Sequence, residues 1–215
     1  MLPVEVDLHI HSRHSNDSRS KVERIIERAI GVGLGGIAIT DHNSWAGARE
    51  AARLAGGRIL IVPGAEIKTD KGDVLALFVT DEIASREFRT VIEEIKARGG
   101  ICVIPHPSDS PKITVEDLQL ADGIESFNST CTPKSNERAA KTVAELKKPA
   151  FSSSDAHLVM EVGHGRTRVP DCRTLDELRK VILDNPMPSR METSNLFLHK
   201  TNAAFNFGIK GIWHR

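Results

Sequence analysis

Residues 4–12 have the sequence VEVDLHIHS, and this stretch sets the pattern that decides the fold. The β-branched, apolar run over residues 4–10 predicts a short strand, which His9 and His11 close. Because residues two apart in an extended chain point the same way, both imidazoles can reach one metal ion, with Asp7 nearby to orient them. Two imidazoles do not complete a coordination sphere, so further ligands are expected elsewhere in the chain.

Short apolar runs alternate with longer amphipathic stretches along the rest of the chain. Strands are expected over residues 4–10, 36–40, 58–62, 73–79, 101–104, 123–127 and 149–151. Helices are expected over residues 21–32, 46–54, 85–98, 135–146 and 175–183. This alternation is typical of βα units around a parallel sheet or barrel, so we expect an α/β fold. Residues 186–215 show no clear periodicity and are expected to be a C-terminal tail of unreadable role, packed on the surface or partly disordered.

The composition narrows the class of protein. A chain of 215 residues with 40% hydrophobic and 27% charged residues is typical of one soluble globular domain. Lys plus Arg and Asp plus Glu each total 29, so no global basic field favours nucleic-acid binding. Neither a leader nor an apolar run of roughly 18 residues is recognisable, so no membrane association is expected. Three cysteines cannot all pair with one another, which suggests a reducing compartment such as the cytoplasm; they are Cys102, Cys131 and Cys172.

Histidines and carboxylates recur where the expected strands give way to loops, the edge at which α/β barrels collect functional groups. After the first strand they occur in Asp41-His42, Glu66, Pro105-His106-Pro107 and Ser154-Asp155-Ala156-His157. Any one of these histidines alone is more often a hydrogen-bonded core or surface residue than a ligand. Their joint placement favours a shared site, and imidazole with carboxylate but no thiolate suits zinc, manganese or iron. The number of ligands predicts two or three divalent metal ions per chain.

These motifs, in this order, resemble those of the polymerase and histidinol phosphatase (PHP) family. The resemblance is carried by Asp7-Leu8-His9-Ile10-His11-Ser12, Ile39-Thr40-Asp41-His42, Pro63-Gly64-Ala65-Glu66, Pro105-His106-Pro107 and Ser154-Asp155-Ala156-His157. It covers residues 4 to about 183, so we expect a PHP domain over residues 1–185. The resemblance implies a distorted seven-stranded β/α barrel of (β/α)7 type, a trinuclear metal centre at the carboxyl ends of the strands, and phosphoesterase activity.

Carried over residue by residue, the resemblance implies three metal sites. The ligands that it implies for the first ion are His9, His11, Glu66 and Asp155. Glu66 would bridge to a second ion, which His106 also binds. The third ion would use His42 and His157.

Two ligand positions stay open. Family members often supply one more ligand to the third site from a Ser-Asp-Gly motif, where this chain has His14-Ser15-Asn16-Asp17-Ser18. We expect Asp17 to serve, with His14 as the alternative because some members use histidine there. The second ion usually has a further ligand after strand six, and Glu125-Ser126-Phe127-Asn128 offers two candidates, of which Asn128 lies nearer the strand end. Asparagine is a weak neutral ligand, so this ion is expected to be loosely held, unless Asn128 caps the following loop instead.

Phosphate binding requires cations near these motifs, since phosphate esters engage Arg or Lys as well as metal. The candidates are Arg13, Arg19, Lys68 and Arg166, each of which is as often an ordinary surface charge. Asp155 and Asp41 are the candidates for protonating the leaving group, a step that metal-bound water could also perform. His164 is expected to be a loop residue, and His199 and His214 are not expected to be ligands.

The sequence therefore favours hydrolysis of a phosphomonoester, a nucleotide or a nucleic-acid 5′ end by in-line attack of a metal-bridging hydroxide. The expected partners are a small phosphorylated substrate or a nucleic-acid 5′ end, with no membrane and no obligate protein partner. One alternative is a catalytically silent metal-binding module that binds a protein or nucleic acid, although all seven principal ligands are present. The other is an amidohydrolase-type barrel, in which a carboxylated lysine usually takes the place that Glu66 occupies here.

Overall fold

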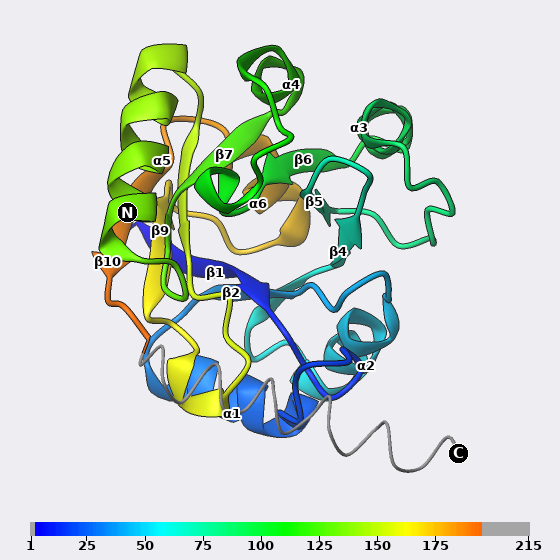
Figure 1. Ribbon diagram of the computed structural model, residues 1–215. Coiled ribbons are helices and arrows are strands. Elements are labelled where there is room, and N and C mark those ends of the chain that lie inside the picture. Colours follow the sequence, from blue (N-terminus) through cyan, green and yellow to red (C-terminus); the bar gives the residue numbers. More distant parts are fainter. Residues whose placement is uncertain (1–2, 195–215) are drawn as a thin grey trace, which may run out of the picture.

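The computed structural model describes residues 3–194, which form a mixed α/β fold around two five-stranded sheets (Figure 1). In the first sheet the strand order is β10 (Met187–Met191), β9 (Gly165–Val169), β1 (Val4–Ile10), β2 (Gly36–Ile39) and β3 (Leu60–Val62). In the second sheet the order is β4 (Gly64–Lys68), β5 (Asp73–Leu77), β6 (Ile101–Ile104), β7 (Gly123–Asn128) and β8 (Ala150–Ser153).

The strands are parallel where βα units connect them and antiparallel elsewhere. β1, β2 and β3 run parallel to one another, as do β6, β7 and β8. The hairpin β4–β5 and the pair β5–β6 are antiparallel, and β9 runs antiparallel to both β1 and β10. The carboxyl ends of the parallel strands therefore gather at one edge of each sheet, which is where ligand-bearing loops meet in α/β folds.

The expected (β/α)7 barrel is not confirmed, because the described strands pair as two sheets rather than as one closed ladder. Within residues 3–194, the strand pairing between the two sheets consists of isolated parallel bridges, Ile10 with Ala156 and His42 with Glu66. Pro63, which separates β3 from β4, has no N–H to donate to a ladder. Strand pairing is thus reduced to single bridges at the junction between the sheets.

Helices lie around the outside of the two sheets (Figure 1). They are α1 (Val22–Gly31), α2 (Ala46–Ala55), α3 (Phe88–Ala97), α4 (Val115–Leu120), α5 (Pro133–Leu146) and α6 (Leu175–Val181), with 3₁₀ turns η1 (Pro107–Asp109) and η2 (Val159–Glu161). Thr114 and Thr174 begin α4 and α6 with capping boxes that satisfy the free N–H groups of the first turn. None of the helices within residues 3–194 is long and apolar enough to cross a bilayer.

Three buried clusters explain how the layers hold together. Ile25, Ile26 and Ala29 on one face of α1 pack with Ile37 and Ile39 of β2, which covers the outer face of the first sheet. A second cluster places α3, α4 and α5 against the second sheet. The third cluster combines residues of both sheets, including Val6, Leu8, Leu75, Leu77 and Val103, so the two sheets pack face to face.

Most expected elements are confirmed, but β4, β9, β10 and α4 were not predicted. β9 has the sequence GRTRV and β10 has MPSRM, and neither contains the apolar run that marks a buried strand. β10 also lies within the segment that we expected to be a tail. It is an edge strand with exposed Met187 and Met191, a position in which proline and arginine are tolerated.

Gly165 permits a close approach between the backbones of β9 and β8, which belong to different sheets. A Cβ at this first residue of β9 would overlap the backbone of Ser153, the last residue of β8. Backbone atoms cannot move aside as a flexible side chain can. We therefore expect Gly165→Ala to lower the free energy of unfolding by about 2 kcal/mol.

Urea denaturation would measure this effect. Gly31→Ala is the matched control, because Gly31 ends α1 with open space around its would-be Cβ, and it should change the stability by less than about 1 kcal/mol. Equal midpoints for the two variants would contradict the close packing of β8 on β9.

Candidate metal centre

Eight side chains from the sequence motifs meet where the two sheets join. His9 lies on β1 and His11 directly follows it, while Asp17 and His42 lie in the loops after β1 and β2. Glu66 lies within β4. His106, Asp155 and His157 follow β6 and β8. The strand ends therefore bring together residues that are up to 148 positions apart in the chain, as between His9 and His157.

Four atoms converge at the first candidate ion site. The Nε2 atoms of His9 and His11 lie 3.1 Å apart. Glu66 Oε2 is 3.4 Å from His9 Nε2 and 3.3 Å from His11 Nε2. Asp155 Oδ1 is 3.4 and 3.2 Å from the same two nitrogens. All four side chains are at least 90% buried, so these contacts lie away from solvent.

A second group gathers around Asp17. Its Oδ2 lies 3.1 Å from His42 Nε2 and 3.2 Å from His157 Nε2. The ring of His157 stacks on that of His11 with centroids 4.3 Å apart. Ligand atoms of His11, Asp17, His42 and His157 all lie within 4.8 Å of one another, which makes this set a candidate metal site.

Glu66 connects these groups to a third. Its Oε1 lies 3.2 Å from His106 Nε2, while its Oε2 faces His9, His11 and His42. His9, Glu66 and His106 form the third set of candidate ligands. The two oxygens of one carboxylate thus point to different groups, as a bridging ligand requires.

A buried oxygen indicates that the residues fit a metal ion. Glu66 Oε2 makes no hydrogen bond of good geometry within the described chain, although His42 Nδ1 lies only 2.9 Å away. A buried carboxylate oxygen without a hydrogen bond is costly unless a cation lies against it. Imidazole nitrogens and carboxylate oxygens are the donors that zinc, manganese and iron prefer.

Electrostatics at the site point the same way. Burial alone would raise the pKa of Glu66 and Asp155, but the surrounding histidines hold both pKa values well below the usual range. Burial would lower the pKa of His42 and of His106. The facing carboxylates nevertheless raise the pKa of His42 to about 11 and that of His106 to about 9. Burial and the neighbouring His157 lower the pKa of His11 to about 4. The carboxylates therefore stay ionised and require positive charge beside them.

Two of the candidate ligands have left-handed backbone conformations. His106 has a φ angle of 31° and Asp155 one of 50°. Such angles are uncommon for residues other than glycine and are typical of functional sites. At each position the sharp turn directly after a strand redirects the side chain toward the cluster.

Other buried carboxylates hold the loops that carry the ligands. Asp41 accepts hydrogen bonds from the backbone N–H and the hydroxyl of Ser12 at 2.6 and 2.8 Å. Asp7 accepts from the N–H groups of Ser154 and Gly163. Burial raises the pKa of Asp41 and of Asp7 to about 6, although these hydrogen bonds oppose the rise. Asp41, one of the two candidates for protonating the leaving group, is fully buried beside Ser12.

Glu161 and two serines perform the same task for His157. Glu161 Oε2 accepts a hydrogen bond from the backbone N–H of His157 at 3.1 Å. Ser18 and Ser20 donate to the carbonyl oxygen of His157 at 2.9 and 3.0 Å. The ring Nδ1 lies 2.9 Å from the carbonyl oxygen of Asp155. Because a carbonyl only accepts, Nδ1 carries the proton and Nε2 is left to face Asp17.

The two alternatives for the open ligand of the third site have different surroundings in the structure. His14 lies outside the cluster, where its Nε2 contacts Glu50 at 2.6 Å, whereas Asp17 contacts two of the candidate ligands. Asn128 is buried beside Asp155, but its Oδ1 accepts from the backbone N–H and the hydroxyl of Thr130. The amide oxygen is thus engaged within its own loop.

The four candidate phosphate-binding cations differ in their surroundings. Arg166 is buried, and its guanidinium donates to Glu5 and to the carbonyl oxygens of Val32 and Gly163. Arg13 forms an ion pair with Glu50. Arg19 is exposed in the loop that carries Asp17.

Lys68 is the cation that the fold places on the strand of a candidate ligand. It is exposed at the end of β4, two residues after Glu66, and therefore on the same face of the strand. It lines a surface pocket with Lys71, Asp73, Asp109 and Lys112, between the β4–β5 turn and the loop that follows His106.

Asp73 lies beside Lys68, and the sequence did not identify it as a candidate site residue. It pairs with Lys68 across β4 and β5, and its Oδ1 is buried without a hydrogen bond in the described part of the chain. Burial and the charge of Glu66 raise its pKa. In the sequence it begins the expected strand over residues 73–79 and belongs to none of the motifs that point to the site.

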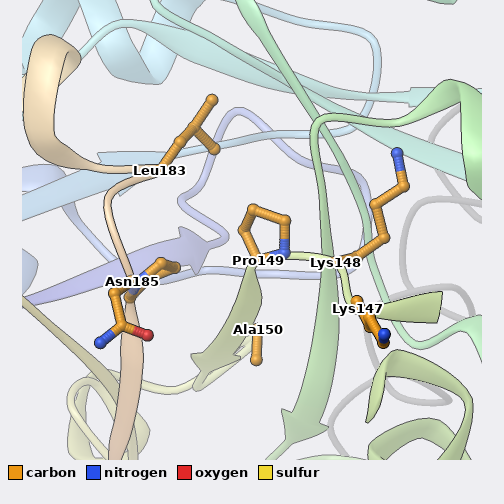
Figure 2. A pocket seen from close by; sticks show the side chains of 7 residues that line it. Lys147, Lys148, Pro149, Ala150, Leu183 and Asn185 are labelled. Atoms are coloured by element: carbon orange, nitrogen blue, oxygen red, sulfur yellow. The ribbon is translucent and has the colours of Figure 1, made fainter. Parts of the chain in front are cut away.

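A different pocket lies at the far end of the fold from these ligands. Figure 2 shows its lining, which includes Lys147, Lys148, Pro149 and Ala150 at the start of β8. Asp155 and His157 follow the other end of that strand. None of the candidate ligands lines this pocket, so it is separate from the candidate metal centre.

One described histidine stands apart from the cluster. His164 lies in the loop before β9, with its Nε2 3.9 Å from Glu192 Oε1. His199 and His214 fall outside the described residues.

Family models and known proteins match this chain. Residues 7–96 match the model described as the PHP domain, and residues 133–185 match the model described as PHP-associated. Uncharacterized protein MJ1587 of Methanocaldococcus jannaschii is 32% identical over 167 residues, which cover 69% of this chain and 96% of that protein.

Two solved structures have a similar fold. One is a two-domain protein of Bacteroides vulgatus that contains a predicted PHP-like metal-dependent phosphoesterase, with a TM-score of 0.71, 18% identity, and coverage of 94% of this chain and 70% of that one. The other is PsfC of Pseudomonas syringae, with a TM-score of 0.72, 18% identity, and coverage of 97% and 100%. At such identity the likeness extends to the fold.

Asp17 and His14 provide a direct test of the third ligand set. We expect Asp17→Asn to lower the bound metal by about one ion per chain, because it removes the charge between His42 and His157. His14→Gln should leave the metal content unchanged. Elemental analysis of the reconstituted proteins measures both, and the reverse result would assign the ligand to His14.

Proposed function

The chain belongs to the PHP family, and we propose that it is a phosphoesterase that uses divalent metal ions to hydrolyse phosphate monoesters. The observation that carries this proposal is the convergence of two imidazole nitrogens, from His9 and His11, with two carboxylate oxygens, from Glu66 and Asp155. Each of the two oxygens lies within 3.4 Å of both nitrogens. Zinc, manganese and iron are the ions that this set of donors suits.

The proposed centre has three ion sites. His9, His11, Glu66 and Asp155 would hold the first ion. His42, His157 and Asp17 would hold the third, and Glu66 with His106 would hold the second. Because the amide oxygen of Asn128 is engaged by Thr130, we propose that the second ion is held more weakly than the others.

Bound divalent ions would act as Lewis acids toward the phosphate oxygens and would lower the pKa of water for attack on phosphorus. Residues of the chain would position the ester. Lys68 is the cation best placed to bind a phosphate oxygen, because it shares a face of β4 with Glu66. Asp73 would accept a hydrogen bond from a hydroxyl of the leaving group, since its Oδ1 is buried without a partner among residues 3–194.

The two residues expected to protonate the leaving group receive other roles in this proposal. Asp155 directs Oδ1 at His9 and His11, so we assign it as a ligand. Asp41 uses both carboxylate oxygens on Ser12 and therefore positions the loop that begins at His11. Solvent at the exposed pocket beside Lys68 would supply the proton.

We propose a small phosphorylated molecule as the substrate. Positive and negative side chains are equal in number, which favours a small ester over a long polyanion. Hydrolysis at a nucleic-acid 5′ end is the second candidate, and a cytoplasmic location fits either substrate.

Purified protein with manganese, zinc or iron tests the proposed activity. Substrates would include p-nitrophenyl phosphate, histidinol phosphate, AMP, a 5′-phosphorylated oligonucleotide and a nucleoside cyclic phosphate. We expect turnover of at least one monoester, lost on treatment with a chelator and in His9→Ala and His157→Ala. Bound metal without turnover of any ester would favour the silent binding module instead.

Lys68 allows a sharper prediction about substrate binding. Loss of one charge-assisted hydrogen bond to phosphate should raise KM roughly tenfold in Lys68→Ala, with metal content unchanged. Lys141→Ala is the control, because Lys141 is exposed on α5 and pairs only weakly with Glu145 at 3.9 Å. A KM unchanged by Lys68→Ala would remove Lys68 from the proposed site.

A further inference from the structure

Glu125 is a buried carboxylate beside the candidate ligands that belongs to none of the three ligand sets. We propose that it is a positioning residue, which holds the His9 ring through Nδ1 and the backbone of His106 so that both present Nε2 to the candidate metal centre. This inference rests on the proposed metal-dependent function.

The contacts of Glu125 direct it away from the ions. Its Oε1 lies 3.0 Å from His9 Nδ1. Its Oε2 accepts from the backbone N–H of His106 at 3.0 Å and from the amide of Asn128 at 2.9 Å. The side chain is 0% exposed. Both oxygens are thus used by donors on the outer side of the ligand rings.

The contact with His9 decides which ring nitrogen carries the proton. A carboxylate oxygen accepts the hydrogen bond that a ring N–H donates, so this contact assigns Nδ1 as the donor. The lone pair is then left on Nε2, the atom that faces Glu66 and Asp155. A carboxylate in this position also makes the imidazole a stronger metal ligand.

A bulge in β7 makes this arrangement possible. Residues three apart in a regular strand point to opposite faces, yet Glu125 and Asn128 contact each other. The register of β7 against β8 shifts between Glu125 and Phe127, which returns Asn128 to the same face. Asn128 also donates to Asp155 Oδ2 at 3.3 Å, so one small network supports His9, His106 and Asp155.

The contact with His106 holds an unfavourable backbone conformation. The φ angle of 31° at His106 is unfavourable for a residue other than glycine unless other contacts compensate. Its N–H donates to Glu125, and its ring then places Nε2 3.2 Å from Glu66 Oε1. Glu125 thereby acts on two ligands of neighbouring sites.

Glu125→Gln tests the inference with little change of shape. The glutamine amide must turn its NH₂ group either toward His9 Nδ1 or toward the N–H of His106 and the amide of Asn128. In either orientation two hydrogen-bond donors face each other. We expect the affinity for zinc to fall roughly 10- to 100-fold by equilibrium dialysis. We also expect ¹⁵N NMR of labelled histidine, assigned with His9→Ala, to show that the hydrogen-bonded Nδ1–H of His9 is lost or altered.

Two further variants make the result interpretable. Glu137→Gln, on the exposed side of α5, should match the wild type in both measurements. Glu125→Asp keeps the charge but shortens the reach, so it should retain more zinc affinity than Glu125→Gln, and it serves if the glutamine variant does not fold. Wild-type affinity and an unchanged His9 signal in Glu125→Gln would overturn the proposal. A wild-type protein that binds none of zinc, manganese and iron would refute the proposed function, whereas the Nδ1–H signal would still decide the role of Glu125.

Discussion

Glu66 and Asp155 are ionised carboxylates that the fold buries almost completely where its two sheets meet. Removing such groups from water costs several kcal/mol each unless positive charge and hydrogen bonds replace the solvent. His9, His11, His42 and His106 lie against these oxygens. The remainder of the site follows from the need to keep these opposite charges in contact.

That need explains why so many polar groups are buried in the surrounding loops. Asp41 holds Ser12, Asp7 holds Ser154, and Glu161 holds the N–H of His157. Each of these carboxylates fixes backbone next to a candidate ligand. Left-handed residues and a bulged strand would be unfavourable in isolation, but here they direct ligand side chains toward a common point.

The sequence was most informative about the site where histidines and carboxylates recur at the ends of expected strands. Histidine and carboxylate at successive strand ends located the cluster, because parallel strands bring those ends together. The ligand roles themselves remain proposals. Buried apolar runs such as 101–104 likewise predicted strands that are confirmed. The PHP resemblance is confirmed by the family matches.

The sequence was least informative where the outcome depends on contacts between distant segments. The polar residues of β9 and β10 hid these strands from the sequence pattern, and only the pairing of β5 with β4 brings Asp73 beside Lys68. Arg166 follows the last motif closely, but its contact with Glu5 across β1 and β9 could not be read from spacing. Division of the strands into two sheets also depends on where pairing stops, which no local pattern encodes.

The isolated bridges between the sheets imply that the candidate metal centre would also affect the stability of the fold. One bridge joins His42 to Glu66, which are themselves candidate ligands. The other joins Ile10, which lies between His9 and His11, to Ala156, which lies between Asp155 and His157. An ion that binds only the folded chain stabilises it by an amount that grows with ion concentration. Because the ligands come from both sheets, that stabilisation would act across their junction and would oppose separation of the halves. Metal occupancy would then determine whether the two sheets exchange their amide hydrogens as one cooperative unit or as two.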